Sequence, residues 1–286
     1  MRIPRIASQI ATGADSPLEN SGSADYSSGG LRGHPFLILM NALTRCLDTY
    51  WSSSIGKKLV VALTGIVLVL FLAGHLIGNL VVFAGAEPFN DYAYFLHHML
   101  HGAGIWLFRG VMLVMVAAHI AATVALTVQN RSARKDYECT ATIQASHASR
   151  TMILSGLTLL AFVVYHMLHF TARIGNEYNT LERYKETVTQ NGVPVLVHGE
   201  PLVRQNAWQM VIDGFTCWPV TLFYVIAMTL LCAHLSHGVG SIFQTLGLRS
   251  KKAASLIQQV SIGYSVFIWL GFVSIPIAIR IFGFGR

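Results

Sequence analysis

Six histidines stand inside the apolar stretches of this sequence, where a polar ring is costly and is usually functional. An imidazole can ligate a metal through one ring nitrogen, carry a proton, or hydrogen-bond to a buried carbonyl or hydroxyl group. Two of the six follow another histidine by three residues, so each of these shares a helix face with its predecessor. The six are His75, His119, His166, His169, His234 and His237.

The stretches that carry these histidines are long enough to cross a bilayer. Of the 286 residues, 53% are hydrophobic and 12% are charged, and the mean hydropathy is +0.53. Soluble domains carry about 25% charged residues, and a transmembrane helix needs about 20 predominantly apolar residues. We therefore predict an all-α membrane protein with five transmembrane helices, four of which form a histidine-bearing bundle. The predicted spans are 57–83, 104–128, 151–172, 214–242 and 257–283.

The basic residues near the span ends predict the orientation, because Lys and Arg accumulate in cytoplasmic loops. They cluster before span one, after span two and after span four, which predicts a cytoplasmic N-terminus. The net charge of +7 follows from this distribution and, without an aromatic and basic platform, does not indicate a nucleic-acid partner. The four cysteines form no C-x-x-C pair, so we expect neither an iron–sulfur cluster nor a zinc framework in this chain.

Three further features complete the predicted domain organisation. Residues 1–35 are rich in Ser, Gly and Asp and are expected to be a disordered extension. Residues 36–52 have apolar side chains at spacings of three and four, as in an amphipathic helix that lies in the membrane interface. Residues 53–286 form the transmembrane domain, and its longest hydrophilic segment, 173–212, is expected to be a loop that caps the membrane domain on the outside.

The depth of each histidine sorts four of them into two pairs. At 1.5 Å per residue from the cytoplasmic end of its span, His75 lies at ~27 Å and His166 at ~22 Å, whereas His119 lies at ~14 Å and His234 at ~12 Å. In an up-down bundle the first and third helices are diagonal, as are the second and fourth, so each pair faces across the core. Two facing imidazoles can hold a flat macrocycle, and two haem b groups about 10 Å apart would form an electron path across the bilayer.

Other candidate residues lie around these pairs. A buried histidine can also be a hydrogen-bonded core residue, but four of them at paired depths favour ligation. Small residues such as Gly74 and Gly238 would either admit a macrocycle or let helices pack closely. His169 and His237 are expected to hydrogen-bond to propionates or water, with ligation by one of them as the alternative, and Arg109 either binds a propionate or extends to the interface. Solvated surface is expected for His97, His98 and His101.

Several motifs, taken in order, resemble a known family. They are SIGKKLVVALTG and GHLIGN in span one, EPFNDYAYF in the following loop, AHIAATVAL and NRSAR at the end of span two, SGLTLLAFVVYHMLHF in span three, and HLSHGVGSIFQTLG in span four. In this order and spacing, over about residues 52–284, the chain resembles the cytochrome b558-type anchor of succinate:quinone oxidoreductases. That group comprises succinate dehydrogenases and fumarate reductases, and its two-haem anchor has five transmembrane helices.

The resemblance implies ligands, partners and a function. The axial ligands of one haem correspond to His75 and His166, and those of the other to His119 and His234. The family implies a flavoprotein with covalently bound FAD and an iron–sulfur subunit, both docked at the cytoplasmic face, with menaquinone reduced near the outer haem. In some members an acidic residue near the start of the second helix handles the quinone proton, and Glu87 is its nearest counterpart. The chain would then be the membrane electron-transfer subunit of a tricarboxylic acid cycle enzyme or of a fumarate reductase.

Two other functions fit part of the sequence. A two-haem cytochrome b that anchors a formate dehydrogenase or a hydrogenase would need the same paired histidines. A transporter of zinc or copper would be expected to combine its histidines with carboxylates or thiols, whereas spans one to three contain no Asp or Glu. The N-terminal extension and the long 173–212 segment depart from the family pattern.

Overall fold

The computed structural model describes residues 44–45, 48–132, 151–190 and 192–286. Its contacts divide the chain into two units, residues 1–46 and 47–286. The predicted extension 1–35 lies outside the described residues. The described residues of the predicted interfacial helix 36–52 are helical. All five long helices belong to the second unit.

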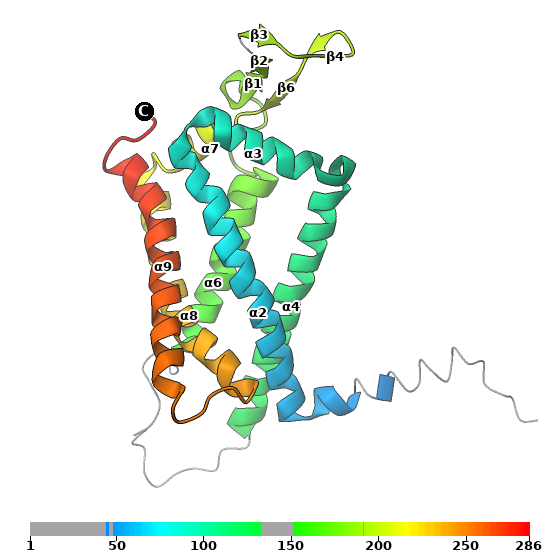
Figure 1. The fold of residues 1–286 in the computed structure, drawn as a ribbon, viewed down its shortest axis with the longest axis vertical. Helices are drawn as coiled ribbons and strands as arrows, with labels where there is room; N and C mark the ends of the chain where they lie inside the picture. Colours follow the sequence, from blue (N-terminus) through cyan, green and yellow to red (C-terminus); the bar gives the residue numbers. More distant parts are fainter. Residues whose placement is uncertain (1–43, 46–47, 133–150, 191) are drawn as a thin grey trace, which may run out of the picture. The chain divides into compact units, whose positions relative to one another are not determined.

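Five helices of the described chain are long and apolar enough to cross a membrane (Figure 1). Each overlaps one predicted span, so the prediction of an all-α, multi-pass membrane protein is confirmed. Many of their large apolar side chains are exposed, as expected of surfaces that face lipid. The five are α2 (Ser54–Leu80), α4 (Ala103–Ser132), α6 (Met152–His166), α8 (Trp218–Thr245) and α9 (Ala254–Arg280).

The local sequence explains several helix ends. The Ser53 hydroxyl caps α2 by accepting a hydrogen bond from the Gly56 N–H at 2.9 Å. Pro219 lies in the first turn of α8, where its missing N–H costs nothing. α6 continues into a π-helix, η3 (Met167–Ala172), which ends at Arg173 in the left-handed region with φ 54°. Because π-turns are frequent at functional sites, the end of the third span is a place where function is expected.

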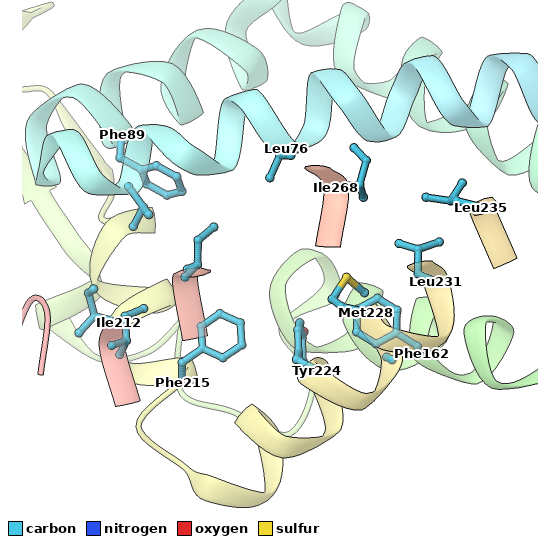
Figure 2. Close-up of a cluster of buried hydrophobic side chains, with 14 residues drawn as sticks. Leu76, Phe89, Phe162, Ile212, Phe215, Tyr224, Met228, Leu231, Leu235 and Ile268 are labelled. Carbon is cyan, nitrogen blue, oxygen red and sulfur yellow. The ribbon is translucent and has the colours of Figure 1, made fainter. Parts of the chain in front are cut away.

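The five helices pack so that α2 and α8 have the most neighbours. α2 contacts α4, α8 and α9, and α8 also contacts α6 and α9. Among the described helices, α2 with α6 and α4 with α8 are absent from these principal contacts, as expected for the diagonals of the predicted bundle. The pair α4 with α6, which that bundle would make neighbours, is absent as well, so the bundle stays a prediction. Figure 2 shows the core, where side chains from α2, α6, α8 and α9 converge. Its buried residues include Leu76, Phe162, Met228, Leu235 and Ile268.

A helix occupies the segment between α2 and α4, where the sequence predicts a loop. α3 (Ala86–His98) follows the 3-10 turn η1 (Val81–Ala84) and connects to α4 through η2 (Met99–Gly102). Pro88 lies in the first turn of α3, a position that helices tolerate well. The loop prediction is therefore wrong, although the predicted exposure of the three histidines is confirmed. These exposed residues are His97, His98 and His101.

Residues 182–214, which we call the cap, contain six short strands and a helix. The prediction of a loop over 173–212 is therefore wrong for most of this segment. The strands pair in antiparallel fashion as β1 with β6, β2 with β3 and β4 with β5. His198 and Gly199 both have positive φ, 54° and 88°, as a type I′ hairpin turn requires. The cap elements are η4 (Glu182–Tyr184), β1 (Lys185–Thr187), β2 (Thr189–Gln190), β3 (Val193–Pro194), β4 (Leu196–Val197), β5 (Glu200–Pro201), β6 (Val203–Gln205) and α7 (Ala207–Gly214).

Buried polar groups fasten the cap to α3 and to the end of α2. Asn90 has no exposed surface; its amide donates to Glu186 and accepts from the Trp208 backbone N–H at 2.9 Å. The Trp208 indole N–H donates to a carbonyl of η1 at 3.0 Å. The Arg204 side chain, 5% exposed, pairs with Asp91 and Glu186, and although burial lowers its pKa, these two carboxylates raise the pKa overall. We call this end of the bundle the cap end, and the opposite end, where α2 begins, the far end.

Candidate functional site

His75 and His166 meet near the cap end of the bundle, and we call them the cap-end pair. Their ring centroids are 5.8 Å apart and their planes cross at 81°. The two side chains come from the diagonal helices α2 and α6, which is the geometry that the depth argument predicts. An aromatic ring one turn earlier supports each of them: Phe71 stacks on His75 at 5.2 Å, and Phe162 stacks on His166 at 5.7 Å. The pair is therefore held in place by packing from its own helices.

The spacing of the cap-end pair fits two axial ligands of one metal-centred macrocycle. An imidazole nitrogen lies about 2.0–2.1 Å from zinc, and bonds of this length on both sides of a metal would hold two ring centroids roughly 6 Å apart. A methyl group placed at Gly74, beside His75, would meet no atom within 4 Å. At Gly78 the same methyl group would overlap the Tyr92 ring, so this second glycine serves helix packing. The residues present thus fit haem at this level, while ligation itself stays a prediction.

Tyrosine hydroxyls separate the roles of the two histidines on the third span. His169 lies in η3, and its two ring nitrogens are 3.2 Å from the Tyr224 hydroxyl and 3.3 Å from the Tyr178 hydroxyl. His166 uses only Nδ1, which lies 3.3 Å from the Tyr224 hydroxyl. Burial raises the pKa of Tyr178, so this phenol stays neutral and available for hydrogen bonding. Of the two alternatives that the sequence left open, His166 therefore suits ligation better.

His119 and His234, which we call the far-end pair, are each oriented by a hydroxyl on a neighbouring helix. His119 Nδ1 lies 3.0 Å from Thr64 Oγ1 on α2, and His234 Nδ1 lies 3.3 Å from Ser155 Oγ on α6. Both hydroxyl protons are donated to carbonyls of the preceding turn, at 2.7 Å and 3.1 Å. With its proton given to that carbonyl, each hydroxyl oxygen is placed to accept the proton of an imidazole Nδ1–H, an arrangement that leaves Nε2 with a free lone pair. This is the tautomer that metal ligation through Nε2 needs.

We call the cap-end pair and the far-end pair the two levels of the site. On both α2 and α6, the hydroxyl residue of the far-end level and the histidine of the cap-end level are separated by the same number of residues. Thr64 precedes His75 by 11 residues on α2, and Ser155 precedes His166 by 11 residues on α6. At 1.5 Å per residue, each hydroxyl lies about 16 Å along its helix from the cap-end histidine. The separation of about 10 Å between the two groups stays a prediction. Among the described residues the cap-end rings touch, whereas no ring contact joins His119 to His234.

The remaining predicted residues lie away from the two pairs or keep only part of their proposed roles. Arg109 has its guanidinium 5.0 Å from the centre of the Trp106 ring, as expected for an arginine at the interface. Burial lowers the pKa of Arg173, and the charge of Arg109 lowers it further, so the two cations lie near each other. His237 is half-buried on α8, and a methyl group at the adjacent Gly238 would meet no atom within 4 Å.

Glu87 lies apart from the histidines. It lines a surface cavity of about 400 Å³ whose other walls come from α3 and from the cap. Asp91, Glu186 and Arg204 share this cavity, and the arginine pairs with both of these carboxylates. The predicted role of Glu87 in quinone protonation therefore gains no support from its position.

The sequence interpretation missed the hydroxyl groups that orient the histidines. Tyr224, Tyr178, Thr64 and Ser155 are ordinary residues in their own segments, and only the packing of different helices brings them to the imidazoles. One signal was available: Thr64 and Ser155 each precede a histidine by 11 residues, close to three helical turns. Such hydroxyls can be found in a sequence only when the helix neighbours are already known.

Comparisons with models of protein families, with curated proteins and with solved structures gave no match. Within the described ranges, no three His, Cys, Asp or Glu side chains come together as a site for a bare metal ion would require. The site is therefore characterised by its own geometry, namely two levels with two imidazoles each.

Proposed function

We propose that this chain is a two-haem cytochrome b, the membrane anchor of a succinate:quinone oxidoreductase. The observation that carries the proposal is the meeting of His75 and His166 across the bundle diagonal at 5.8 Å. A second level 11 residues away, where Thr64 and Ser155 orient His119 and His234, supports a second group. The sequence motifs favour this family over other two-haem anchors.

The proposed ligands are the cap-end pair for one haem b and the far-end pair for the other. Held between two imidazoles, each haem would supply one-electron transfer. The chain's own part is to hold the rings: Phe71 and Phe162 support the cap-end pair, and the Thr64 hydroxyl fixes the tautomer of His119. The apolar helices around them exclude water and keep the four imidazoles neutral.

The proposed partners dock at the far end, which the basic residues assign to the cytoplasm. There a flavoprotein with FAD and an iron–sulfur subunit would exchange electrons with the far-end level, and menaquinone would react near the cap end. Succinate oxidation would send electrons toward the cap, and fumarate reduction would send them the other way. Both directions use the same ligands, in a multi-pass protein of the bacterial cytoplasmic membrane.

The side chains around the four imidazole rings also favour this proposal over a histidine-lined metal transporter. A transporter for zinc or copper would need carboxylate or thiol donors beside each histidine, whereas the described polar neighbours of these four rings are hydroxyls and, at His75, the Asn79 amide 3.3 Å from Nδ1 and 3.4 Å from Nε2. An anchor of a formate dehydrogenase or a hydrogenase would share the four ligands. Co-purification of the soluble subunits and assay with succinate, formate or hydrogen would distinguish these.

A reduced-minus-oxidised absorption spectrum of the purified chain tests the proposal. We expect a b-type spectrum and two haems per chain. His75→Ala or His166→Ala should lose the cap-end haem and keep the other, and His119→Ala or His234→Ala should lose the far-end haem and keep the cap-end one. His98→Ala, which changes an exposed histidine on α3, is the matched control and should retain both. A chain without b-type absorption, or with unchanged haem content in all four variants, would rule out the proposed function.

A further inference from the structure

The Tyr224 hydroxyl lies between two histidines of the third span. It is 3.3 Å from His166 Nδ1 and 3.2 Å from His169 Nδ1. The tyrosine is 6% exposed, and its ring is wedged edge-on between Phe162 at 5.0 Å and Phe215 at 4.9 Å. Because these rings hold the phenol in place, its oxygen has a fixed position relative to both imidazoles.

The Tyr224 hydroxyl cannot treat the two histidines alike, since it has one proton to donate and lone pairs to accept with. One Nδ1 must accept the phenolic proton, while the other must donate its own proton to the phenolic oxygen. The choice fixes the tautomer of both rings, because a neutral imidazole carries its proton on only one nitrogen. Two arrangements are possible.

In the first arrangement Tyr224 donates to His169, whose Nε2–H then donates to the Tyr178 hydroxyl at 3.3 Å. His166 donates its Nδ1–H to the Tyr224 oxygen and keeps a free lone pair on Nε2, on the side of the ring away from the tyrosine. In the second arrangement Tyr224 donates to His166, which leaves a buried Nε2–H with no partner among the described residues. The first arrangement in turn leaves the buried Tyr178 O–H without an acceptor among the described residues, so the cost of about 1–3 kcal/mol for an unpaired donor arises in both. Only the first arrangement leaves His166 Nε2 free to bind a metal.

Both arrangements leave His169 without a free nitrogen, because a tyrosine hydroxyl occupies each side of its ring. We propose that Tyr224 is a positioning residue that makes His166 the only available cap-end ligand, by fixing its tautomer and by keeping His169 hydrogen-bonded. This inference rests on the proposed haem function. It assigns Tyr224 and Tyr178 roles that the histidine pattern alone does not contain.

The test is Tyr224→Phe, which removes the hydroxyl but keeps the ring packing. Loss of the Nδ1 hydrogen bond makes His166 a less basic ligand, and partners of this kind are worth about 10–100-fold in metal affinity. We expect weaker retention of the cap-end haem by that factor, a raised reduction potential for this haem, and two ligand populations in its electron paramagnetic resonance spectrum. In the double variant Tyr224→Phe with His169→Ala, a single population should return, which a purely structural role of the tyrosine would not produce.

Tyr165→Phe is the matched control. Its ring lies 5.4 Å from His169 and 6.1 Å from Tyr224, and no hydrogen bond of its hydroxyl to either histidine is among the described contacts. The control should leave the spectrum and the potential unchanged. His169→Ala alone should retain both haems with a wild-type spectrum, and this variant tests the proposal even where Tyr224→Phe accumulates poorly.

The outcomes separate the two proposals. A wild-type chain without haem refutes the proposed function. A wild-type chain with two haems refutes the role of Tyr224 if Tyr224→Phe keeps the wild-type spectrum, potential and affinity. Loss of the cap-end haem in His169→Ala also overturns it, because His169 would then be the ligand.

Discussion

Replacing Asn90 by alanine is expected to release the cap from the bundle while the five long helices stay folded. Asn90 is fully buried and hydrogen-bonds to Glu186, to Asn206 Oδ1 at 3.0 Å and to the Trp208 backbone N–H at 2.9 Å. In the variant the Trp208 N–H loses its partner, which costs about 1–3 kcal/mol, whereas the other two groups keep second partners and lose about 0.5–1.5 kcal/mol each. The total is about 4 kcal/mol.

A loss of about 4 kcal/mol in the free energy of cap opening raises the population of the open state roughly a thousandfold. Hydrogen exchange in detergent measures this directly. The reporter is the Trp208 indole N–H, which donates from the cap to a carbonyl of η1 at 3.0 Å and becomes free to exchange when the cap leaves the bundle. Asn130→Ala, a change at an exposed position of α4, is the control. Exchange rates within tenfold of wild type in Asn90→Ala would refute the assignment of Asn90 as the main fastening of the cap.

Three further outcomes are expected. Thr64→Val keeps the shape of the side chain but removes the acceptor of His119, so haem at the far end should be held about 10–100-fold less tightly, as equilibrium titration would measure. Burial, and then the hydrogen bond to a carboxylate, raise the pKa of Tyr184. The stability that Tyr184 contributes is therefore complete below the ordinary tyrosine pKa near 10 and is lost as pH rises through the pKa in the folded protein. Tyr184→Phe should thus make the unfolding of the cap less dependent on pH in the alkaline range, and an unchanged pH dependence contradicts this. In Gly271→Ala the new methyl group would lie 2.6 Å from Leu76 side-chain atoms, and we expect a loss of about 1–3 kcal/mol in thermal or denaturant unfolding.

The membrane architecture could be predicted because hydropathy alone decides it. Five long apolar runs leave no alternative to helices in a bilayer, where every backbone group must be satisfied internally. The span ends are shifted by a few residues. The cap Ser53 precedes the apolar run, and the turn η1 continues that run although α2 has already ended. Extended segments of two or three residues carry too few side chains for a period to be recognised, which explains why the strands of the cap were missed. Asn-Gly at 191–192 and His-Gly at 198–199 were the available hairpin signals.

The candidate site, too, could be predicted only in part from the sequence. The meeting of His75 and His166 follows from counting residues along two spans, and the structure brings them together as predicted. The tautomers could not be predicted, because they depend on Thr64 reaching a residue 55 positions later and on Tyr224 reaching residues 58 and 55 positions earlier. Contacts over such sequence distances depend on helix rotation and tilt, which hydropathy does not determine.

The 11-residue spacing on α2 and α6 constrains how this sequence can change. Eleven residues complete about three turns, so Thr64 and His75 point in nearly the same direction, as do Ser155 and His166. One inserted residue between them would rotate the two levels by about 100° relative to each other, and at least one of the two sites would then face away from the bundle. Apart from Phe71 and Phe162, which stack on the histidines, the intervening apolar residues are constrained less in type than in number, because the number alone sets the angle between one site and the next.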